Sequence, residues 1–213
     1  TTCPGCGSNS STSRAASARS ARKFWPKRRS GRADPEGAGI DAIVAHNGGP
    51  MRDDRSLGAY LHVPFCGQRC AYCDFNTYAG LKSLIPAYVS ALLAEFRALA
   101  PWYEGSAATL YLGGGTPSLL DAENVFALLN SVKQKFTVSN DLEITIEVNP
   151  GTITSDKLTG YLKAGVNRIN IGIQSFQDSY LTSLGRIHNA REAFACFEIV
   201  RLAGFENIGV DLI

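Results

Sequence analysis

Three closely spaced cysteines are the residues of this sequence whose types and spacing most clearly indicate chemistry. Cys66, Cys70 and Cys73 have the spacing Cys-x3-Cys-x2-Cys and directly follow the apolar run 59–63, which predicts a buried strand. A compact loop with three thiolates can bind three irons of a [4Fe–4S] cube, whereas most such cubes have four cysteine ligands. The spacing therefore predicts a cluster whose fourth iron takes a ligand from outside the protein.

Two simpler interpretations of the same loop stay open, a structural zinc site and a set of disulfides. The chain has six cysteines. It shows no signal-peptide segment, so metal chemistry or free thiols are favoured over a disulfide framework. Cys3 and Cys6 form half of a zinc knuckle without a second half, and we interpret them as free thiols. Cys196 lies within a helical apolar pattern and is expected to be a small core residue.

A glycine-rich loop is the second feature that indicates a binding site. The residues Gly-Gly-Gly-Thr-Pro at 113–117 follow a predicted strand and precede a predicted helix. Glycines let the backbone approach a ligand closely, and its N–H and C=O groups can then hydrogen-bond that ligand. A phosphate-binding loop is rejected because the lysine of the Walker pattern is missing. A tight strand-to-helix turn without a ligand is the alternative.

Polar residues at the ends of predicted strands form a third group. Glu143, Thr145 and Glu147 alternate with apolar residues in one strand, which we expect to be covered on both faces. Buried polar groups need partners, so Glu147 is a candidate to accept hydrogen bonds from ribose hydroxyls or an ammonium group. Gln174 and Arg186 follow the next strand, and the planar guanidinium of Arg186 suits a carboxylate. Each residue alone is more typical of a structural role, but together they favour a site.

These candidates require a scaffold that brings strand ends together. Strands are predicted at 59–63, 108–112, 142–148, 168–172 and 208–212. Helices are predicted from Ser83 to Leu99, Asp121 to Phe136, Ser155 to Gly165, Asp178 to Leu184 and Asn189 to Gly204, with Ser83 and Asn189 as caps. This alternation predicts an α/β fold of parallel βα units, as an open sheet or part of a barrel. Chemistry in such folds lies at the carboxyl ends of strands, where the cysteine loop, the glycine loop, Glu147 and Asp211 all fall.

Composition separates a basic N-terminal segment from the rest of the 213-residue chain. Residues 1–33 hold eight of the 21 Lys and Arg and no acid, and residues 1–55 are expected to be disordered. This segment could be an organellar transit peptide, an interaction arm, or non-native sequence before Met51. The remainder is acidic, with 13 Lys and Arg against 19 Asp and Glu, so we expect no nucleic-acid partner. No run of 18 apolar residues occurs, so no transmembrane segment is expected.

Several motifs together resemble the radical S-adenosylmethionine (radical SAM) superfamily and, within it, the oxygen-independent coproporphyrinogen III oxidase family. The resemblance covers about residues 58–213 and is carried by the motifs Tyr60-Leu-His-Val-Pro-Phe-Cys66, Tyr111-Leu-Gly-Gly-Gly-Thr-Pro-Ser118, Glu147-Val-Asn-Pro150, Gly165-Val-Asn-Arg-Ile-Asn-Ile-Gly-Ile-Gln-Ser175 and Leu184-Gly-Arg-Ile-His188. It implies a partial TIM-type barrel, here over residues 56–213. Since the family has six βα units and a C-terminal domain, we expect this chain to be truncated in its fifth strand.

The resemblance also implies the residues of the site. In the superfamily, three cysteines hold a [4Fe–4S] cluster, and the amino and carboxylate groups of SAM chelate its open iron. The cluster ligands would be Cys66, Cys70 and Cys73. The SAM contacts would be Tyr60, Tyr72, Gly114, Gly115, Thr116, Glu147, Gln174, Arg186 and Asp211, with the glycine loop receiving the amino group. An electron donor for cluster reduction is implied as a partner.

One position distinguishes two branches of the resembled family. The oxidases carry a further cysteine two residues after the third cluster ligand, where this chain has Phe75. This residue and the form Cys73-Asp-Phe-Asn resemble the heme chaperone (HemW-like) branch, whose members bind heme and pass it to apoproteins. We therefore expect a heme chaperone; the alternatives are an oxidase of porphyrin biosynthesis, acting on coproporphyrinogen III, and a structural zinc module. The expected location is cytoplasmic, or organellar if the basic segment is a transit peptide.

Overall fold

The computed structural model describes residues 44–45, 56–102 and 105–213. Most of the segment 1–55, for which the sequence predicts disorder, lies outside the described residues, as do Cys3 and Cys6. Within that segment, β1 (Val44–Ala45) is a two-residue strand that pairs antiparallel with Gly58 and Ala59 of the first long strand. No helix in the described ranges has the length and apolar content needed to cross a membrane.

A six-stranded sheet in the order β1-β2-β5-β6-β7-β8 organises the fold. Its long strands are β2 (Ser56–Val63), β5 (Ser106–Gly114), β6 (Thr137–Val148), β7 (Arg168–Gln174) and β8 (Asn207–Leu212). From β2 to β8 every neighbouring pair is parallel. Because the strands follow one another in chain order, successive right-handed crossovers place their helices on the same side of the sheet. This arrangement confirms the predicted α/β partial barrel.

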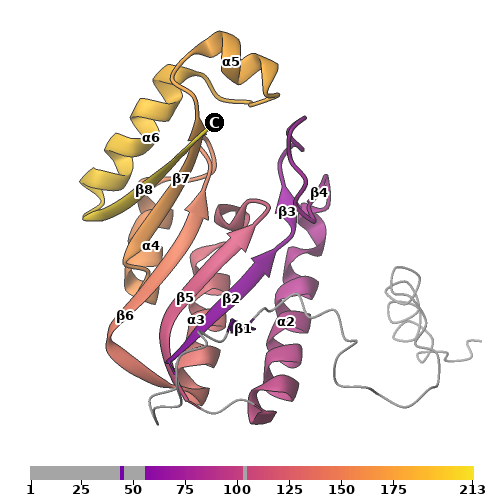
Figure 1. The fold of residues 1–213 in the computed structure, drawn as a ribbon, viewed down its shortest axis with the longest axis vertical. Coiled ribbons are helices and arrows are strands. Elements are labelled where there is room, and N and C mark those ends of the chain that lie inside the picture. The colour runs from indigo at the N-terminus through magenta and orange to yellow at the C-terminus, as the bar shows by residue number, and fades with distance from the viewer. Residues whose placement is uncertain (1–43, 46–55, 103–104) are drawn as a thin grey trace, which may run out of the picture. The chain divides into compact units, whose positions relative to one another are not determined.

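The longer helices form one layer outside the sheet (Figure 1). They are α2 (Ile85–Leu99), α3 (Ala122–Lys135), α4 (Ser155–Ala164) and α6 (Ala190–Leu202), whereas the short α5 (Asp178–Ser183) lies beyond the carboxyl ends of the strands. Helix α2 packs on α3, α3 on α4, and α4 on α6. The apolar residues of α3 recur at helical spacing, and Val125, Leu128, Leu129 and Val132 are each at most 2% exposed. Burial of such a side chain contributes about 1.5–3 kcal/mol, so this face holds the helix on the sheet.

The two faces of the sheet differ in polarity, which corrects one expectation. Toward the helices, β5, β6 and β7 present aliphatic side chains such as Leu112, Ile146 and Ile171, all of which are fully buried. On the opposite face, however, Glu143 is 38% exposed on its side chain and pairs with Arg168 at 3.3 Å. The expectation that the third predicted strand is covered on both faces is therefore wrong at Glu143, because the α2–α3–α4–α6 layer covers the other side.

The ends of two predicted elements also differ from expectation. Ser83 does not cap α2 but lies in the 3-10 helix η2 (Lys82–Leu84), and α2 has no side-chain cap. Pro86 in the first turn has no N–H, so fewer donors need a cap. Strand β6 begins at Thr137 rather than Leu142, because Thr137 and Val138 pair with β5. Cross-strand pairing here outweighs local propensity.

Other predicted helix ends are confirmed. Asn189 caps α6 through a capping box, with Oδ1 accepting from the Glu192 N–H at 2.9 Å and the Glu192 carboxylate accepting from the Asn189 N–H at 2.9 Å. Gly165 follows α4 with φ of 101°, the left-handed conformation that glycine adopts most easily. The 3-10 helices η3 (Ala100–Trp102) and η4 (Pro117–Leu119) complete the connections.

A short strand pair, not predicted from the sequence, closes the cysteine loop. Strand β3 (Phe65–Cys66) lies parallel to β4 (Tyr78–Ala79), and the Tyr78 N–H donates to the Pro64 carbonyl at 2.7 Å. The chain between these strands, residues 67–77, is therefore held as a closed loop just beyond the carboxyl end of β2. Two of the three cysteines lie within this loop, and Cys66 lies in β3 at its start.

Candidate functional site

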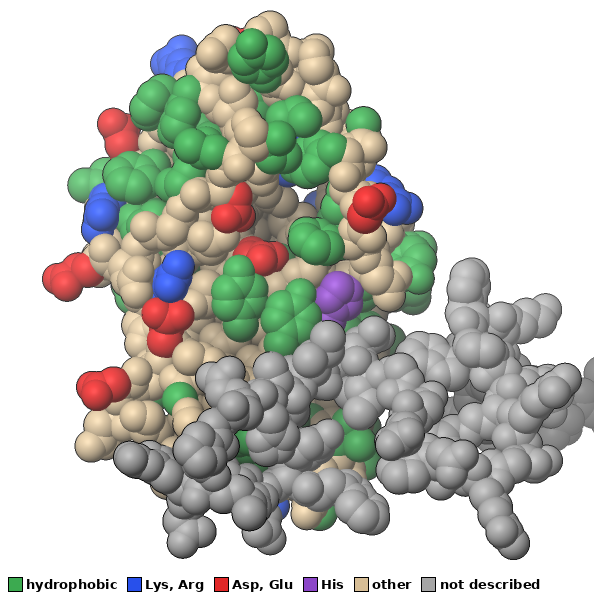
Figure 2. Space-filling model, in the orientation of Figure 1, with side chains coloured by type: hydrophobic (Ala, Val, Ile, Leu, Met, Phe, Trp, Pro, Cys, Tyr) green, Lys and Arg blue, Asp and Glu red, His purple; other side chains and the backbone are tan. Residues whose placement is uncertain are grey.

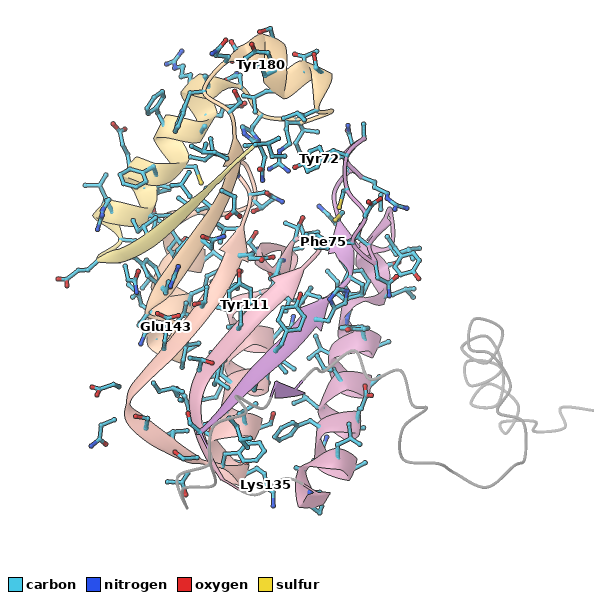
Figure 3. All side chains as sticks on the ribbon, viewed as in Figure 1. Tyr72, Phe75, Tyr111, Lys135, Glu143 and Tyr180 are labelled. Carbon is cyan, nitrogen blue, oxygen red and sulfur yellow. The ribbon has the colours of Figure 1, made fainter. Side chains whose placement is uncertain are left out.

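The carboxyl ends of the parallel strands and the cysteine loop enclose a cavity of about 390 Å³. Figure 2 shows this face hollowed near its centre, with acidic side chains on the wall. In Figure 3, Tyr72 and Phe75 from the cysteine loop and Tyr111 from β5 lie around this region. Side chains from five strands and from the loops that follow them therefore converge on one space, as is typical of ligand sites in parallel α/β folds.

Eleven of the twelve site residues predicted from the sequence line this cavity. They are Cys66, Cys70, Cys73, Tyr72, Gly114, Gly115, Thr116, Glu147, Gln174, Arg186 and Asp211. The exception is Tyr60, which lies on β2 and stacks on Tyr111 with 5.8 Å between ring centroids. Tyr60 therefore supports the wall through Tyr111 rather than lining the cavity itself.

The glycine loop packs directly against the cysteine loop. The Gly115 N–H donates to the Val63 carbonyl at 2.8 Å, and the Thr116 N–H donates to the Phe65 carbonyl at 2.7 Å. The Gly114 N–H is also taken, since it donates to the Glu147 carboxylate at 3.1 Å. The expectation that these N–H groups are free for a ligand is therefore wrong. A ligand at this loop meets carbonyl oxygens instead, and carbonyls accept hydrogen bonds from an ammonium group.

The three cysteines of the loop all carry free thiols. Cys66 is 8% exposed, and Cys70 and Cys73 are partly exposed toward the cavity. In the described ranges, no three His, Cys, Asp or Glu side chains are arranged to hold a single metal ion. A tetrahedral zinc needs its sulfurs close together, at about 2.3 Å from one ion, whereas each thiolate of a cube binds a different iron. Three free thiolates can each bind a different iron of a [4Fe–4S] cube, so the donor set fits this cluster.

Arg186 links the cysteine loop to the strand ends. Its guanidinium donates to Asn149 Oδ1 and to the Gly172 carbonyl, both at 2.6 Å, and to Cys70 Sγ at 3.4 Å. Its Nε–H is buried and has no hydrogen-bond partner among the described residues. Since buried donors are rarely left unpaired, this N–H is available to an anionic group in the cavity.

Glu147 is the main acidic group of the wall. Its carboxylate accepts hydrogen bonds from the Tyr111 hydroxyl at 2.7 Å and from the Gly114 N–H at 3.1 Å. Burial raises the pKa of Glu147, and these two hydrogen bonds oppose the rise. Burial, together with the nearby Glu147 charge, raises the pKa of Tyr60 to about 12. The wall therefore presents the neutral Tyr111 beside the Glu147 carboxylate, and Asp211 adds a second carboxylate.

The raised pKa of Glu147 predicts a pH-dependent cost to stability. Since folding favours the protonated form, wild-type stability falls as pH rises from the unperturbed value of 4.5 through the raised folded pKa. Glu147→Gln cannot ionise at this position, so its free energy of unfolding should not show this fall. The difference in free energy of unfolding, variant minus wild type, should therefore increase as pH rises over this range. Urea unfolding at several pH values measures the difference. Glu95→Gln, on the exposed side of α2, is the control. Parallel profiles for wild type and Glu147→Gln would contradict the prediction.

Gln174 has an unusual backbone conformation at the cavity. Its φ is 71°, and among the described residues it is the non-glycine residue with a positive φ. The pairing of β7 with β8 is irregular between Gly172 and Gln174, as at a bulge. Such irregularities turn a side chain out of the regular alternation, and strained residues cluster at functional sites. The conformation is therefore consistent with a binding role for Gln174.

Sequence reasoning missed several residues that line the cavity. Asn170 donates to Asp211 Oδ2 at 2.7 Å, and Asn149 donates to Thr116 Oγ1 at 3.0 Å. Asn170 could have been found, because it is a polar position in an otherwise apolar alternation on β7. The other missed residues are Gln68, Arg69, Thr77, Tyr111, Pro117, Val148 and Gly172, whereas Phe75 was singled out from the sequence. Those in the cysteine loop carry no sequence signal, because the β3–β4 pair brings them to the cavity.

The same region of the chain is similar to known proteins. Residues 60–213 match the family model described as the Radical SAM superfamily. The heme chaperone HemW of Haemophilus influenzae is 41% identical over 163 residues, and that of Escherichia coli is 42% identical over 159 residues. In each case the match covers 73% of this chain and 42% of the relative. The chain thus spans about two fifths of the length of these relatives.

A solved structure supports the same relationship. The coproporphyrinogen III oxidase HemN of Escherichia coli, described as a radical SAM enzyme, is 30% identical, with a TM-score of 0.66. The superposition covers 72% of this chain and 36% of that protein. The shared region is therefore the barrel, which carries the cavity described above.

Proposed function

The chain belongs to the radical SAM superfamily, and on that basis we propose that Cys66, Cys70 and Cys73 hold a [4Fe–4S] cluster with SAM at its open iron. Three free thiols beside one cavity support this assignment. The bound pair would supply one-electron chemistry, while the protein binds, orients and shields it. Thiolate ligation requires a reducing compartment, so we propose the cytoplasm, or an organelle if residues 1–55 act as a transit peptide.

The remaining wall residues suit the groups of SAM. The unpaired Nε–H of Arg186 would receive the carboxylate, and the carbonyls of the glycine loop would receive the ammonium group. Glu147 and Asp211 would accept from the ribose hydroxyls, with Gln174 and Tyr72 nearby. Because Tyr111 and Gly114 already hold the Glu147 carboxylate, it would be oriented before the ligand enters.

We further propose that the whole protein is a heme chaperone, which binds heme and passes it to an apoprotein. The observation that carries this proposal is the sequence identity of 41% and 42% to two relatives that are named heme chaperones. Phe75 adds support, since it lines the cavity with 65% of its surface exposed, where the resembled oxidases have a cysteine. Phenylalanine cannot ligate metal. It offers instead an apolar face at the cavity.

The described histidines limit how heme could bind here. His62 Nε2 donates to the Asn76 carbonyl at 2.9 Å, and His188 Nε2 donates to the Ile173 carbonyl at 3.1 Å. His188 is also 95% buried, being only 5% exposed. His62 Nδ1 lies 3.4 Å from the Tyr60 hydroxyl, so both nitrogens of His62 have partners, and the His188 ring is buried. We propose that the described part of the chain contacts the porphyrin ring of heme and that no histidine of this part ligates the heme iron.

A second candidate, the oxidase, has its own observation in favour. The structural neighbour with a TM-score of 0.66 is that oxidase. It would convert coproporphyrinogen III to protoporphyrinogen IX by oxidative decarboxylation, with an electron donor as partner. The zinc module is disfavoured because residues 60–213 match the radical SAM superfamily.

One experiment separates the two functions. The reconstituted chain receives SAM, a reductant and coproporphyrinogen III without oxygen, and a parallel sample receives heme and then apomyoglobin as a general acceptor. We expect no protoporphyrinogen IX, saturable binding of about one heme, and transfer of that heme to the acceptor. Heme bound to serum albumin is the control for spontaneous transfer. Formation of protoporphyrinogen IX would refute a function limited to chaperoning.

A further inference from the structure

A second, smaller cavity of about 40 Å³ lies behind Cys70 and Arg186. Its polar lining comes from Gln68, Cys70, Thr116, Asn149, Thr152, Arg186 and His188. A cavity needs only about 10–15 Å³ on this measure to hold a water molecule, provided that polar groups line it. The cavity is therefore large and polar enough for at least one water.

His188 places an unsatisfied acceptor at this cavity. The ring is 5% exposed, and its Nε2 lies 3.1 Å from the Ile173 carbonyl. A carbonyl only accepts, so Nε2 carries the proton and donates. Burial and the neighbouring Arg186 charge lower the pKa of His188, which favours the neutral ring. Nδ1 is then a lone-pair acceptor, and it has no partner among the described residues.

Three side chains around the cavity donate hydrogen bonds to groups other than His188. Gln68 donates to the Gly185 carbonyl at 3.1 Å, and Asn149 donates to Thr116 Oγ1 at 3.0 Å. Thr152 Oγ1 donates to the Asn149 carbonyl at 2.7 Å. Roughly 90% or more of buried polar groups in proteins are hydrogen-bonded, often through ordered water. No described donor lies within hydrogen-bond distance of Nδ1, so a water in the cavity is the group that could supply the donor.

We propose that an ordered water in this cavity donates to His188 Nδ1, and that His188 with this water is the positioning element for Arg186. The ring donates to the Ile173 carbonyl and Arg186 donates to the adjacent Gly172 carbonyl, so the two side chains bind neighbouring residues near the end of β7. The segment also meets the cysteine loop, because the Ala71 N–H donates to the Leu184 carbonyl at 3.4 Å. The consequence for SAM affinity rests on the function proposed for Arg186.

Two crystal structures test the water site without any ligand. Wild type should show a water within hydrogen-bond distance of His188 Nδ1. His188→Gln keeps a donor for Ile173 but removes the Nδ1 acceptor, so it should lose that water and lengthen the contact between Arg186 and Gly172. An empty cavity in wild type, or an unmoved Arg186 in the variant, would overturn the proposal.

Calorimetric titration with SAM tests the consequence for binding. His188→Gln should bind SAM about 5- to 10-fold more weakly at unchanged iron content, and His188→Asn, which restores an acceptor near Nδ1, should recover part of that loss. Cys196→Ala, in the core face of α6, should lower the melting temperature without changing SAM affinity. Unchanged affinity in His188→Gln would overturn the positioning role. If wild type itself binds no SAM, the proposed function fails, and the crystal structures still decide the water site.

Discussion

Replacement of Cys66, Cys70 or Cys73 by alanine, one at a time, should abolish the iron–sulfur cluster. Each thiolate would hold a different iron, and the cube has no fourth cysteine in its loop to compensate. After anaerobic reconstitution with iron and sulfide, we expect about four irons per wild-type chain and fewer than about one per variant. Iron and sulfide assays and electron paramagnetic resonance after reduction measure the loss.

Cys196→Ala is the matched control for the cluster prediction. Cys196 is 5% exposed on α6, and burial raises the pKa of its thiol to about 11, so it is an inert core residue. This variant should keep the full iron content. Stoichiometric zinc in wild type without an iron–sulfur signal would contradict the prediction and favour the alternative of a structural zinc module. Full iron content in any loop variant would remove that cysteine from the ligand set.

Gly115→Ala should destabilise the site more than the addition of one methyl group suggests. A Cβ at this position would lie 2.6 Å from the Phe65 carbonyl oxygen and 3.0 Å from Cys66 Sγ. The first neighbour is backbone that β3 holds in place, so the glycine loop must move away from the cysteine loop. We expect a loss of about 1–3 kcal/mol in the free energy of unfolding and at most about half of the wild-type iron content.

Gly67→Ala is the control for Gly115→Ala. Gly67 lies in the cysteine loop, and no atom lies within 4 Å of a Cβ built there. Neither glycine has φ in the left-handed region, so alanine fits both backbones. Gly67→Ala should therefore keep both stability and iron. If urea unfolding and iron assays do not distinguish the two variants, the packing of one loop on the other is not what holds the cysteines.

Local patterns in the sequence predict most of the elements correctly. The four apolar residues of α3 at helical spacing are its buried face, and the Asn189 capping box begins α6 as expected. These features depend on residues within a few positions of one another. The two boundaries that differ depend on more. Ser83 is not a cap because of a proline three residues later, and β6 is extended by pairing with β5.

The sequence also indicated which residues form the site, but not how they are connected. Strand-end positions and the family resemblance together identified eleven residues that line one cavity, because parallel strands bring their carboxyl ends together in any such fold. The sequence did not show that Tyr60 stacks on Tyr111 behind the cavity wall, so its expected contact with SAM stays a prediction. Asn149 and Gly172 were missed as partners of Arg186, since 37 and 14 residues separate them from it.

By itself, the sequence determined the three cysteines, the glycine loop and the βα alternation that places both at strand ends. These follow from residue type and short-range spacing, which act the same way in any environment. Only the tertiary structure decided that the N–H groups of the glycine loop bind the cysteine loop and Glu147 instead of a ligand. It alone also left Arg186 Nε and His188 Nδ1 without partners. Hydrogen bonding of this kind depends on which groups meet across the fold, and sequence spacing carries no record of that.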